Sequence, residues 1–369
     1  MADIFSYLAW RGDLPMSVCS FQEVDGMILA RLSYLPYELL LPEGGASSIA
    51  EAAALLPLLP QEAMRPEDRR LLTELAASER FRDLRISNYV NRKDVKTQTQ
   101  FAAITIHLED GTRYLSFRGT DNTLYGWKED FNMSFVCPVP AQTAALHYLQ
   151  VAALRERGAL LLGGHSKGGN LAVYAAAFCG EGVQRRIRMV YNYDGPGFDE
   201  RVLRQDAYRE VCGRVHTFVP QSSVIGMLLG HEEQYTIVHS EESGLMQHDM
   251  YSWDVLRSGF SCLETVSNSS RFLDGTLKTW LQGMDYAQRE TFFDTMYALL
   301  VDANVKTLRE LMDNKFACAK NVLKALRKQD PETRRAVSQA LLLLMKSTKV
   351  GLLRVMQSRS AQKQEKGEA

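Results

Sequence analysis

The chain has 369 residues and a net charge of −1, and 46% of its residues are hydrophobic while 24% are charged. These values are typical of a soluble globular protein and exclude a mostly disordered, collagen-like or coiled-coil chain. The length favours one large domain with additions or two domains. Because a net charge so close to zero provides no general attraction for nucleic acid, we expect no nucleic-acid partner.

Three features of the sequence indicate where the protein is located and whether it binds a metal. They are its apolar stretches, its first residues and its cysteines. Every long apolar stretch is interrupted by Glu, Pro or Lys before it reaches the ~18 residues that a transmembrane helix needs. The first 16 residues lack the basic flank of a secretory signal. The six cysteines form no CxxC pair and no zinc-like spacing with histidine. We therefore expect a cytoplasmic protein with reduced thiols, no metal and no cofactor.

Residues 1–95 are predicted to be mostly helical. Candidate helices cover residues 25–34, 49–59 and 66–80, the last beginning with a proline and two acidic residues. The pattern then changes to β-rich runs at 101–107 and 114–117, which flank the turn 109–112. This arrangement predicts a β-hairpin.

Strands and helices are predicted to alternate from this hairpin to Trp253. The predicted elements are helices 141–157 and 170–178 and short apolar strands 159–163, 187–193, 215–219 and 235–238. Alternation of this kind indicates a largely parallel sheet covered by helices on both faces. The predicted fold class is therefore α/β.

The strand signals stop after Trp253. Residues 255–357 are predicted to be helical, with Asp330 as N-cap and Pro331 at the first position of the last long helix. The expected domain organisation is a sheet-containing domain 1–262 (with a helical segment 1–95 and a core 96–262), a helical accessory region 263–357 and a flexible polar tail 358–369.

The C-terminal residues carry most of the positive charge. Residues 316–369 contain 12 Lys and Arg and 4 Asp and Glu, a net charge of +8, whereas the residues before them sum to −9. The plainer interpretation is a solvated helix face. The alternative is a weak peripheral contact with an anionic membrane, to which each basic side chain contributes about 1 kcal/mol.

Residues Gly164–Gly168 (GHSKG) form the most informative motif. They match G-x-S-x-G and lie between a predicted buried strand and a predicted helix, as a nucleophile elbow requires. The sharp turn exposes the hydroxyl of Ser166, and the glycines let strand and helix backbones pass closely. Ser166 is the predicted nucleophile.

A serine nucleophile needs a base and an orienting acid. His248, in the loop after the last predicted core strand, is the favoured base; His239, His231 and His216 are the alternatives. Asp194 is the favoured acid because it ends strand 187–193 and opens a tight turn. Its alternatives are Asp199, Glu232 and Asp249.

The oxyanion hole is predicted to combine the backbone N–H of Lys167 with one from the loop 117–121, where Thr120 is the candidate. The nearby stretch 126–130 (GWKED) brings charged residues. Holding this loop in place is at least as good an explanation for them as a catalytic role.

Together these motifs resemble the class 3 lipase branch of the α/β-hydrolases and, over residues 1–260, the uncharacterised bacterial family DUF2974. The segments that carry the resemblance are 7–13, 100–103, 117–121, 126–131, 164–172, 193–198, 222–226 and 247–249. The resemblance implies an α/β-hydrolase fold and serine hydrolase chemistry with Ser166 as nucleophile and His248 as base. Class 3 lipases usually place the acid after the strand that here ends at Pro220, where this chain has Gln221. Either the acid has moved one strand earlier, to Asp194, which is the favoured interpretation, or the triad is incomplete.

The leading functional hypothesis is an esterase or lipase-like enzyme that hydrolyses a small or lipid-like acyl ester through an acyl-enzyme. A thioesterase, an amidase or an acyltransferase would use the same residues. A non-catalytic interaction module is the third hypothesis, and it predicts no labelling by a serine-directed fluorophosphonate probe.

Overall fold

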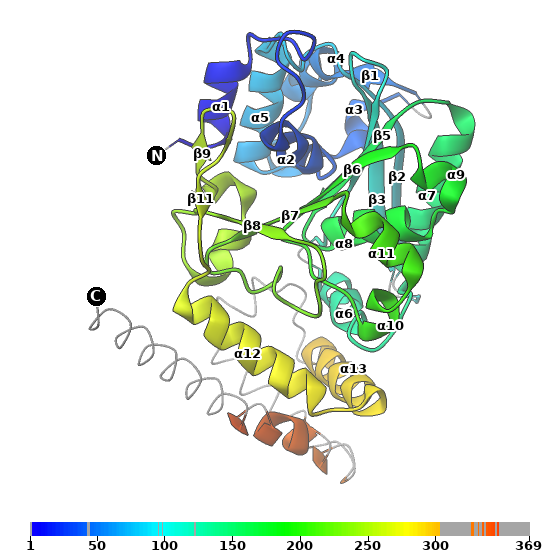
Figure 1. The fold of residues 1–369 in the computed structure, drawn as a ribbon, viewed down its shortest axis with the longest axis vertical. Coiled ribbons are helices and arrows are strands. Elements are labelled where there is room, and N and C mark those ends of the chain that lie inside the picture. The colour runs from blue at the N-terminus through cyan, green and yellow to red at the C-terminus, as the bar shows by residue number, and fades with distance from the viewer. Residues whose placement is uncertain are drawn as a thin grey trace.

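The computed structural model describes residues 2–302 apart from 43, 44, 95, 98 and 122, together with residues 326–327, 331, 334–335, 337–343 and 345–346. A nine-stranded sheet with helices on both faces forms its centre (Figure 1). This arrangement confirms the α/β class predicted from the alternation of strands and helices.

The strands of the large sheet lie side by side in the same order in which they occur in the sequence. Its strands, in spatial order, are β1 (Ser47–Ser48), β2 (Arg85–Asp94), β3 (Thr99–His107), β4 (Arg113–Phe117), β5 (Leu160–His165), β6 (Ile187–Tyr193), β7 (Val215–Pro220), β8 (Tyr235–Val238) and β11 (Cys262–Leu263). Strands β4 to β8 pair in parallel and the remaining pairs are antiparallel. The five parallel strands therefore place their carboxyl ends at one edge, where ligands bind in open α/β sheets.

Helices from different regions of the chain cover the two faces. One face carries the N-terminal helices α1 (Ile4–Arg11), α2 (Glu23–Leu32), α3 (Tyr37–Leu40), α4 (Ile49–Ala54) and α5 (Pro66–Ala77). The other face carries α7 (Pro140–Arg155), α8 (Lys167–Phe178) and α11 (Asp206–Cys212). Short helices α9 (Glu181–Gln184) and α10 (Glu200–Leu203) lie in the connections.

Side chains alternate between two hydrophobic cores along the central strands. Tyr114 of β4 and Leu161 of β5 pack with the N-terminal helices, whereas Leu115 and Leu162, one residue further on, pack with α7 and α8. This alternation follows from the two-residue period of a strand. Both faces are buried, which explains why these strands are continuous apolar runs in the sequence.

The C-terminal helices are α12 (Asn268–Gln282) and α13 (Tyr286–Asp302). Helix α13 packs against α6 (Leu124–Asn132), and its Tyr286 also donates a hydrogen bond to Asp199. Phe293 of α13 stacks on Phe131 of α6 with a centroid distance of 4.6 Å. Phe293 also belongs to a third apolar cluster, which includes Phe135 and Trp280. Helix α6 and the Tyr286–Asp199 hydrogen bond therefore connect α13 to the part of the molecule that contains the sheet.

Most predicted elements are confirmed, but the prediction of a mostly helical 1–95 is wrong at its end. Residues 85–94 form β2, the strand that continues the hairpin of β3 and β4. A bulge between Ser87 and Val90, with Asn88 at a φ of +54°, breaks the two-residue alternation of this strand. The sequence RISNYVNRKD consequently lacks a strand pattern.

The segment after Trp253 also differs from the prediction. Instead of a helix, residues 255–263 contain β11 and the hairpin of β9 (Val255–Leu256) with β10 (Gly259–Phe260). Strands of two residues are too short to produce a periodic pattern. The predicted helix 49–59 is shorter, because the α4 helix ends at Ala54 and a 3-10 turn η1 (Leu56–Leu58) follows.

Two further expectations concern the C-terminal residues and membrane-spanning helices. The N-cap predicted at Asp330 and the tail 358–369 lie outside the described residues. Within the described residues, no helix combines the length and the apolar character needed to cross a membrane.

Candidate active site

Ser166 occupies a strained turn between β5 and α8. Its φ of +59° and ψ of −135° lie in a region that non-glycine residues rarely adopt. A Cβ on Gly164 would lie 2.3 Å from the Gly168 carbonyl carbon, and one on Gly168 would lie 2.1 Å from the Phe117 carbonyl oxygen. Both glycines of the motif are therefore required by close backbone contact. Among the described residues, the Ser166 hydroxyl has no hydrogen-bond partner.

An acid–base pair forms at the same edge of the sheet. The Nδ1 atom of His248 lies 2.6 Å from Oδ2 of Asp194. Asp194 directly follows β6, and its side chain is 1% exposed, whereas that of His248 is 22% exposed. The second carboxylate oxygen of Asp194 accepts hydrogen bonds from the Ser223 hydroxyl and the Gly226 N–H. Asp194 is thus fixed on one side and paired with His248 on the other.

The alternative histidines have other partners. His231 Nδ1 lies 2.8 Å from Glu233 Oε1, and His239 Nδ1 lies 3.6 Å from Asp254. His216 contacts the rings of Tyr191 and Phe218 on β6 and β7. None of these three histidines contacts Asp194 in the described structure.

The alternative acids are engaged elsewhere. Asp199 caps α10 and accepts hydrogen bonds from Arg201 and Tyr286. Asp249 forms an ion pair with Arg65 at 2.7 Å. Glu232 lies 3.9 Å from Arg209. Asp194 is therefore the acid that the structure brings to His248.

The loop with Thr120 passes directly against the elbow. A Cβ on Gly119 would lie 2.5 Å from the His165 carbonyl oxygen and 3.0 Å from Cβ of Ser166. The hydroxyl of Thr120 donates to Asp130 at 2.6–2.7 Å. Lys167 begins α8, and its backbone N–H is one of the amides that have no partner inside the helix. The two predicted oxyanion-hole residues thus lie on adjoining segments.

A buried ion pair holds the side chain of Lys167. Its Nζ atom lies 2.7 Å from Oε2 of Glu129, and both side chains are 0% exposed. Glu129 also accepts hydrogen bonds from the backbone N–H groups of Gln100 and Ala141. Glu129 therefore anchors the Lys167 side chain and Asp130 holds Thr120, in line with the interpretation that the charged residues of 126–130 keep this loop in place. Lys128 instead pairs with Asp294 of α13.

Electrostatics at Asp130 differ from those of an ordinary surface carboxylate. Burial raises the pKa of Asp130 to about 6, although the Lys167 ammonium group, 3.7 Å away, acts in the opposite direction. Asp130 is thus a carboxyl group that changes its charge near neutral pH beside the Thr120 hydroxyl.

Sequence reasoning missed Tyr34 and the role of His165. The Tyr34 hydroxyl lies 3.0 Å from Nδ1 of His165 and accepts a hydrogen bond from the Gly119 N–H. His165 Nε2 lies 2.7 Å from the carbonyl oxygen of His248. His165 could have been noted from its place in the motif, but no local signal links Tyr34 to a residue 131 positions away.

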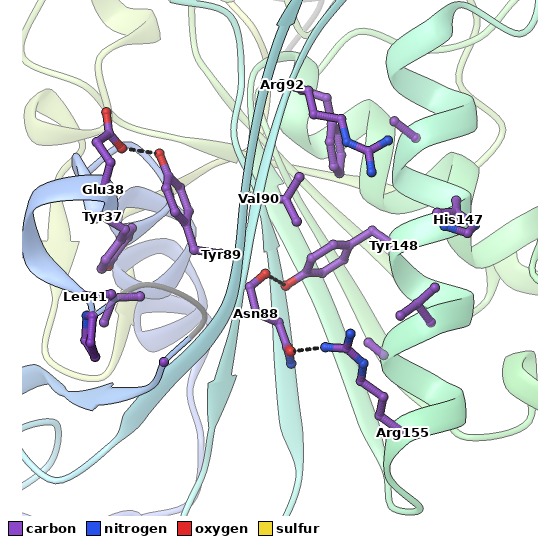
Figure 2. A pocket seen from close by; sticks show the side chains of 16 residues that line it. Tyr37, Glu38, Leu41, Asn88, Tyr89, Val90, Arg92, His147, Tyr148 and Arg155 are labelled. Atoms are coloured by element: carbon purple, nitrogen blue, oxygen red, sulfur yellow. Dashed lines mark hydrogen bonds between the residues drawn. The ribbon is translucent and has the colours of Figure 1, made fainter.

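A separate cavity of about 900 Å³ extends along β2 between α3 and α7 (Figure 2). Tyr37 and Tyr89 line it on one side of the strand, and Val90 and Tyr148 line it on the other. The predicted triad is not among its lining residues, so this cavity is distinct from the candidate site. No cluster of His, Cys, Asp and Glu among the described residues could hold a metal ion.

Comparison with known proteins found a matching family model and similarity to solved structures. A family model described as Mbeg1-like matches residues 75–298, a range that includes every residue of the candidate site except Tyr34. No curated protein matches the chain. Among solved structures, the chain is similar to the native Rhizomucor miehei lipase propeptide complex, with 16% identity and a TM-score of 0.34 over 59% of this chain and 81% of that chain.

Proposed function

The chain belongs to the Mbeg1-like family, which is the lipase-like DUF2974 family that the sequence motifs resemble, and from this premise we propose that it is a serine hydrolase of carboxylic esters. The substrate would be a small or lipid-like acyl ester. The parallel block β4 to β8, with Ser166 after β5 and Asp194 after β6, supports an α/β-hydrolase fold for the domain.

In the proposed mechanism Ser166, His248 and Asp194 act as a triad. The Ser166 oxygen attacks the ester carbonyl carbon while Nε2 of His248 takes the hydroxyl proton, and the carbonyl electron pair moves to the oxygen. When that pair returns, the bond to the alcohol breaks, and His248 gives its proton to the leaving alcohol. Water then repeats both steps on the acyl-enzyme, releasing the acid and regenerating Ser166. Asp194 keeps the Nδ1 proton of His248 in place and stabilises the transient imidazolium.

The negative charge that develops on the carbonyl oxygen would be stabilised by the backbone N–H groups of Lys167 and Thr120. The N-terminus of α8, which begins at Lys167, would add the positive end of the helix dipole to this stabilisation. Because Asp130 holds the Thr120 hydroxyl and Glu129 holds the Lys167 ammonium group, both residues are fixed before substrate binds. The Lys167 side chain is therefore a structural anchor in this mechanism and not a base.

The 2.6 Å contact between His248 and Asp194, together with the strained backbone of Ser166, is the observation that carries the proposal. A fluorophosphonate probe should label the wild-type protein and fail to label Ser166→Ala. p-Nitrophenyl esters of increasing chain length, with matched thioesters and amides, would then define the acyl chemistry. A folded Ser166→Ala protein that hydrolyses these esters as fast as the wild type would overturn the proposal.

A further inference from the structure

Three hydrogen bonds link the oxyanion loop to the candidate base through the interior. The Gly119 N–H donates to the Tyr34 hydroxyl oxygen at 3.1 Å, and that hydroxyl lies 3.0 Å from Nδ1 of His165. On the other side of the ring, Nε2 of His165 lies 2.7 Å from the carbonyl oxygen of His248. Three segments distant in the sequence are joined, because Tyr34 follows α2, His165 ends β5 and His248 ends the 3-10 turn η3 (Gly244–His248).

The chemistry of these groups fixes the direction of each bond. The carbonyl oxygen of His248 can only accept, so Nε2 of His165 must carry the proton. In the neutral imidazole Nδ1 is then an acceptor, and the Tyr34 O–H donates to it. The Tyr34 oxygen remains free to accept from Gly119. The His165 carbonyl is a second and longer acceptor for the Tyr34 hydroxyl, at 3.4 Å.

The surroundings of His165 favour this neutral form. The side chain is buried, and burial, the neighbouring His248 side chain and the guanidinium groups of Arg31 and Arg65 hold the pKa of His165 well below the usual value. A protonated ring would present N–H at Nδ1 to the Tyr34 oxygen and displace the Tyr34 proton from this bond. The bond directions given above thus correspond to the neutral form of His165 that its environment favours.

His165 also contacts the ring of the candidate base. The two imidazole rings have a centroid distance of 4.4 Å, so His165 supports His248 both at its carbonyl oxygen and along its ring. With Asp194 bonded to Nδ1, the orientation of the His248 ring is defined from two sides. The same hydroxyl that serves His165 anchors Gly119, the residue directly before Thr120.

We propose that Tyr34 and His165 are positioning residues that set the orientation of His248 and, through Gly119, the oxyanion loop. This inference rests on the proposed function, because it assigns His248 and Thr120 their roles. Neither Tyr34 nor His165 is proposed to touch the substrate. They act by holding the base and the oxyanion hole in one fixed relation to Ser166.

The test uses Tyr34→Phe and His165→Phe, which remove the bonds while keeping an aromatic ring. Tyr114→Phe is the matched control, because Tyr114 is a buried tyrosine of β4 whose hydroxyl also bonds to α2, at Gly26. We expect kcat for ester hydrolysis to fall roughly 10–100-fold in both test variants, with KM within about twofold, as small displacements of reacting groups predict. His165→Gln retains an N–H donor for the His248 carbonyl and should restore some of the lost kcat.

A spectroscopic measurement separates this inference from the proposed function. The Nδ1 proton of His248, held on Asp194, should give a strongly deshielded proton resonance. This resonance should shift or broaden in His165→Phe and remain unchanged in Tyr114→Phe. If the wild type hydrolyses esters but the test variants match Tyr114→Phe in kcat and resonance, the positioning role is wrong and the hydrolase stands. If the wild type neither hydrolyses esters nor binds the probe, the proposed function fails, and the resonance alone decides whether His165 positions His248.

Discussion

The polar side chains of the candidate site fall into two groups. Some have their polar atoms bonded to other side chains, and others keep an atom without a partner among the described residues. Lys167 is fully paired with Glu129, and Thr120 is held by Asp130. In contrast, His248 uses only Nδ1, and within the described structure its Nε2 has no hydrogen-bond partner. Proton transfer in the proposed mechanism uses these two groups, a ring nitrogen and a serine hydroxyl that other residues do not already engage.

The first prediction concerns the acid. Asp194→Asn should lower kcat for ester hydrolysis about 10³–10⁴-fold, because an amide cannot stabilise the imidazolium and favours the wrong tautomer of His248. The double variant with His248→Ala should be scarcely worse than the poorer single variant, since the residues act as a unit. Asp249→Asn, which changes the neighbouring carboxylate that pairs with Arg65, is the control and should retain activity. Near-normal kcat in a folded Asp194→Asn protein would mean that another residue is the acid.

The second prediction uses the raised pKa of Asp130, which is about 6 in the folded protein and near 4 in an unfolded chain. Between these two values the folded state binds the proton more tightly, so Asp130 lowers the free energy of unfolding as the pH rises from about 4 to about 6. Asp130→Asn removes this dependence. The free energy of unfolding of the wild type, minus that of Asp130→Asn, should therefore fall by on the order of 2 kcal/mol between about pH 4 and about pH 6. Urea titration at each pH measures this difference. A difference that stays constant or rises with pH would contradict the pKa shift.

Among individual residues, the sequence predicted those that can be chosen from a nearby motif or strand end. It missed those whose contacts join distant parts of the sequence. Asp194 and His248 could be chosen because each follows a recognisable strand at the edge that also carries the elbow. Their mutual contact was an expectation, and the structure contains it. Tyr34 was not found, because its partners His165 and Gly119 are set by the packing of α2 against the sheet. No periodicity or motif encodes that packing.

Among the elements, the central parallel strands were the easiest to predict. Strands β6 and β8 match their predicted bounds, since both are apolar runs bounded by polar residues. In β2 the bulge at Ser87–Val90 removes the alternating pattern, and the exposed residues toward Asp94 make the strand resemble a loop. Helix α6 begins after a capping threonine, Thr123, and packs on α13, a contact between segments distant in the sequence.

The third prediction tests the contact between α13 and α6. Phe293 is 6% exposed and stacks on Phe131, so Phe293→Ala should lower the free energy of unfolding by about 3–5 kcal/mol through lost burial and a cavity. Val301→Ala, on the same helix at a position that is 50% exposed, is the control and should change stability by less than about 0.5 kcal/mol. Equal urea midpoints for the two variants would show that α13 does not pack on α6 as described.

For the molecule as a whole, charge and apolar surface coincide near the C-terminal end of the described residues. Arg327, Arg334 and Arg335 are exposed there. Leu341, Leu342 and Met345 are also exposed, at 41%, 56% and 66%. Exposed apolar side chains next to basic ones are typical of segments that lie on a membrane surface. This exposure favours the lipid-contact interpretation of the +8 C-terminal charge over a purely solvated face.

The last prediction is therefore that the full-length protein binds anionic lipid vesicles. At low salt it should float with vesicles containing phosphatidylserine and not with neutral phosphatidylcholine vesicles, and high salt should reverse the binding. Neutralising Arg327, Arg334 and Arg335 to Gln should weaken binding by roughly 100-fold, since each basic residue near the surface contributes about 1 kcal/mol. The control changes Arg185, Arg188 and Arg204 to Gln, three exposed arginines that lie on the sheet-containing domain. Equally poor flotation with both vesicle types at low salt would contradict the membrane interpretation. The C-terminal charge would then belong to a solvated helix face.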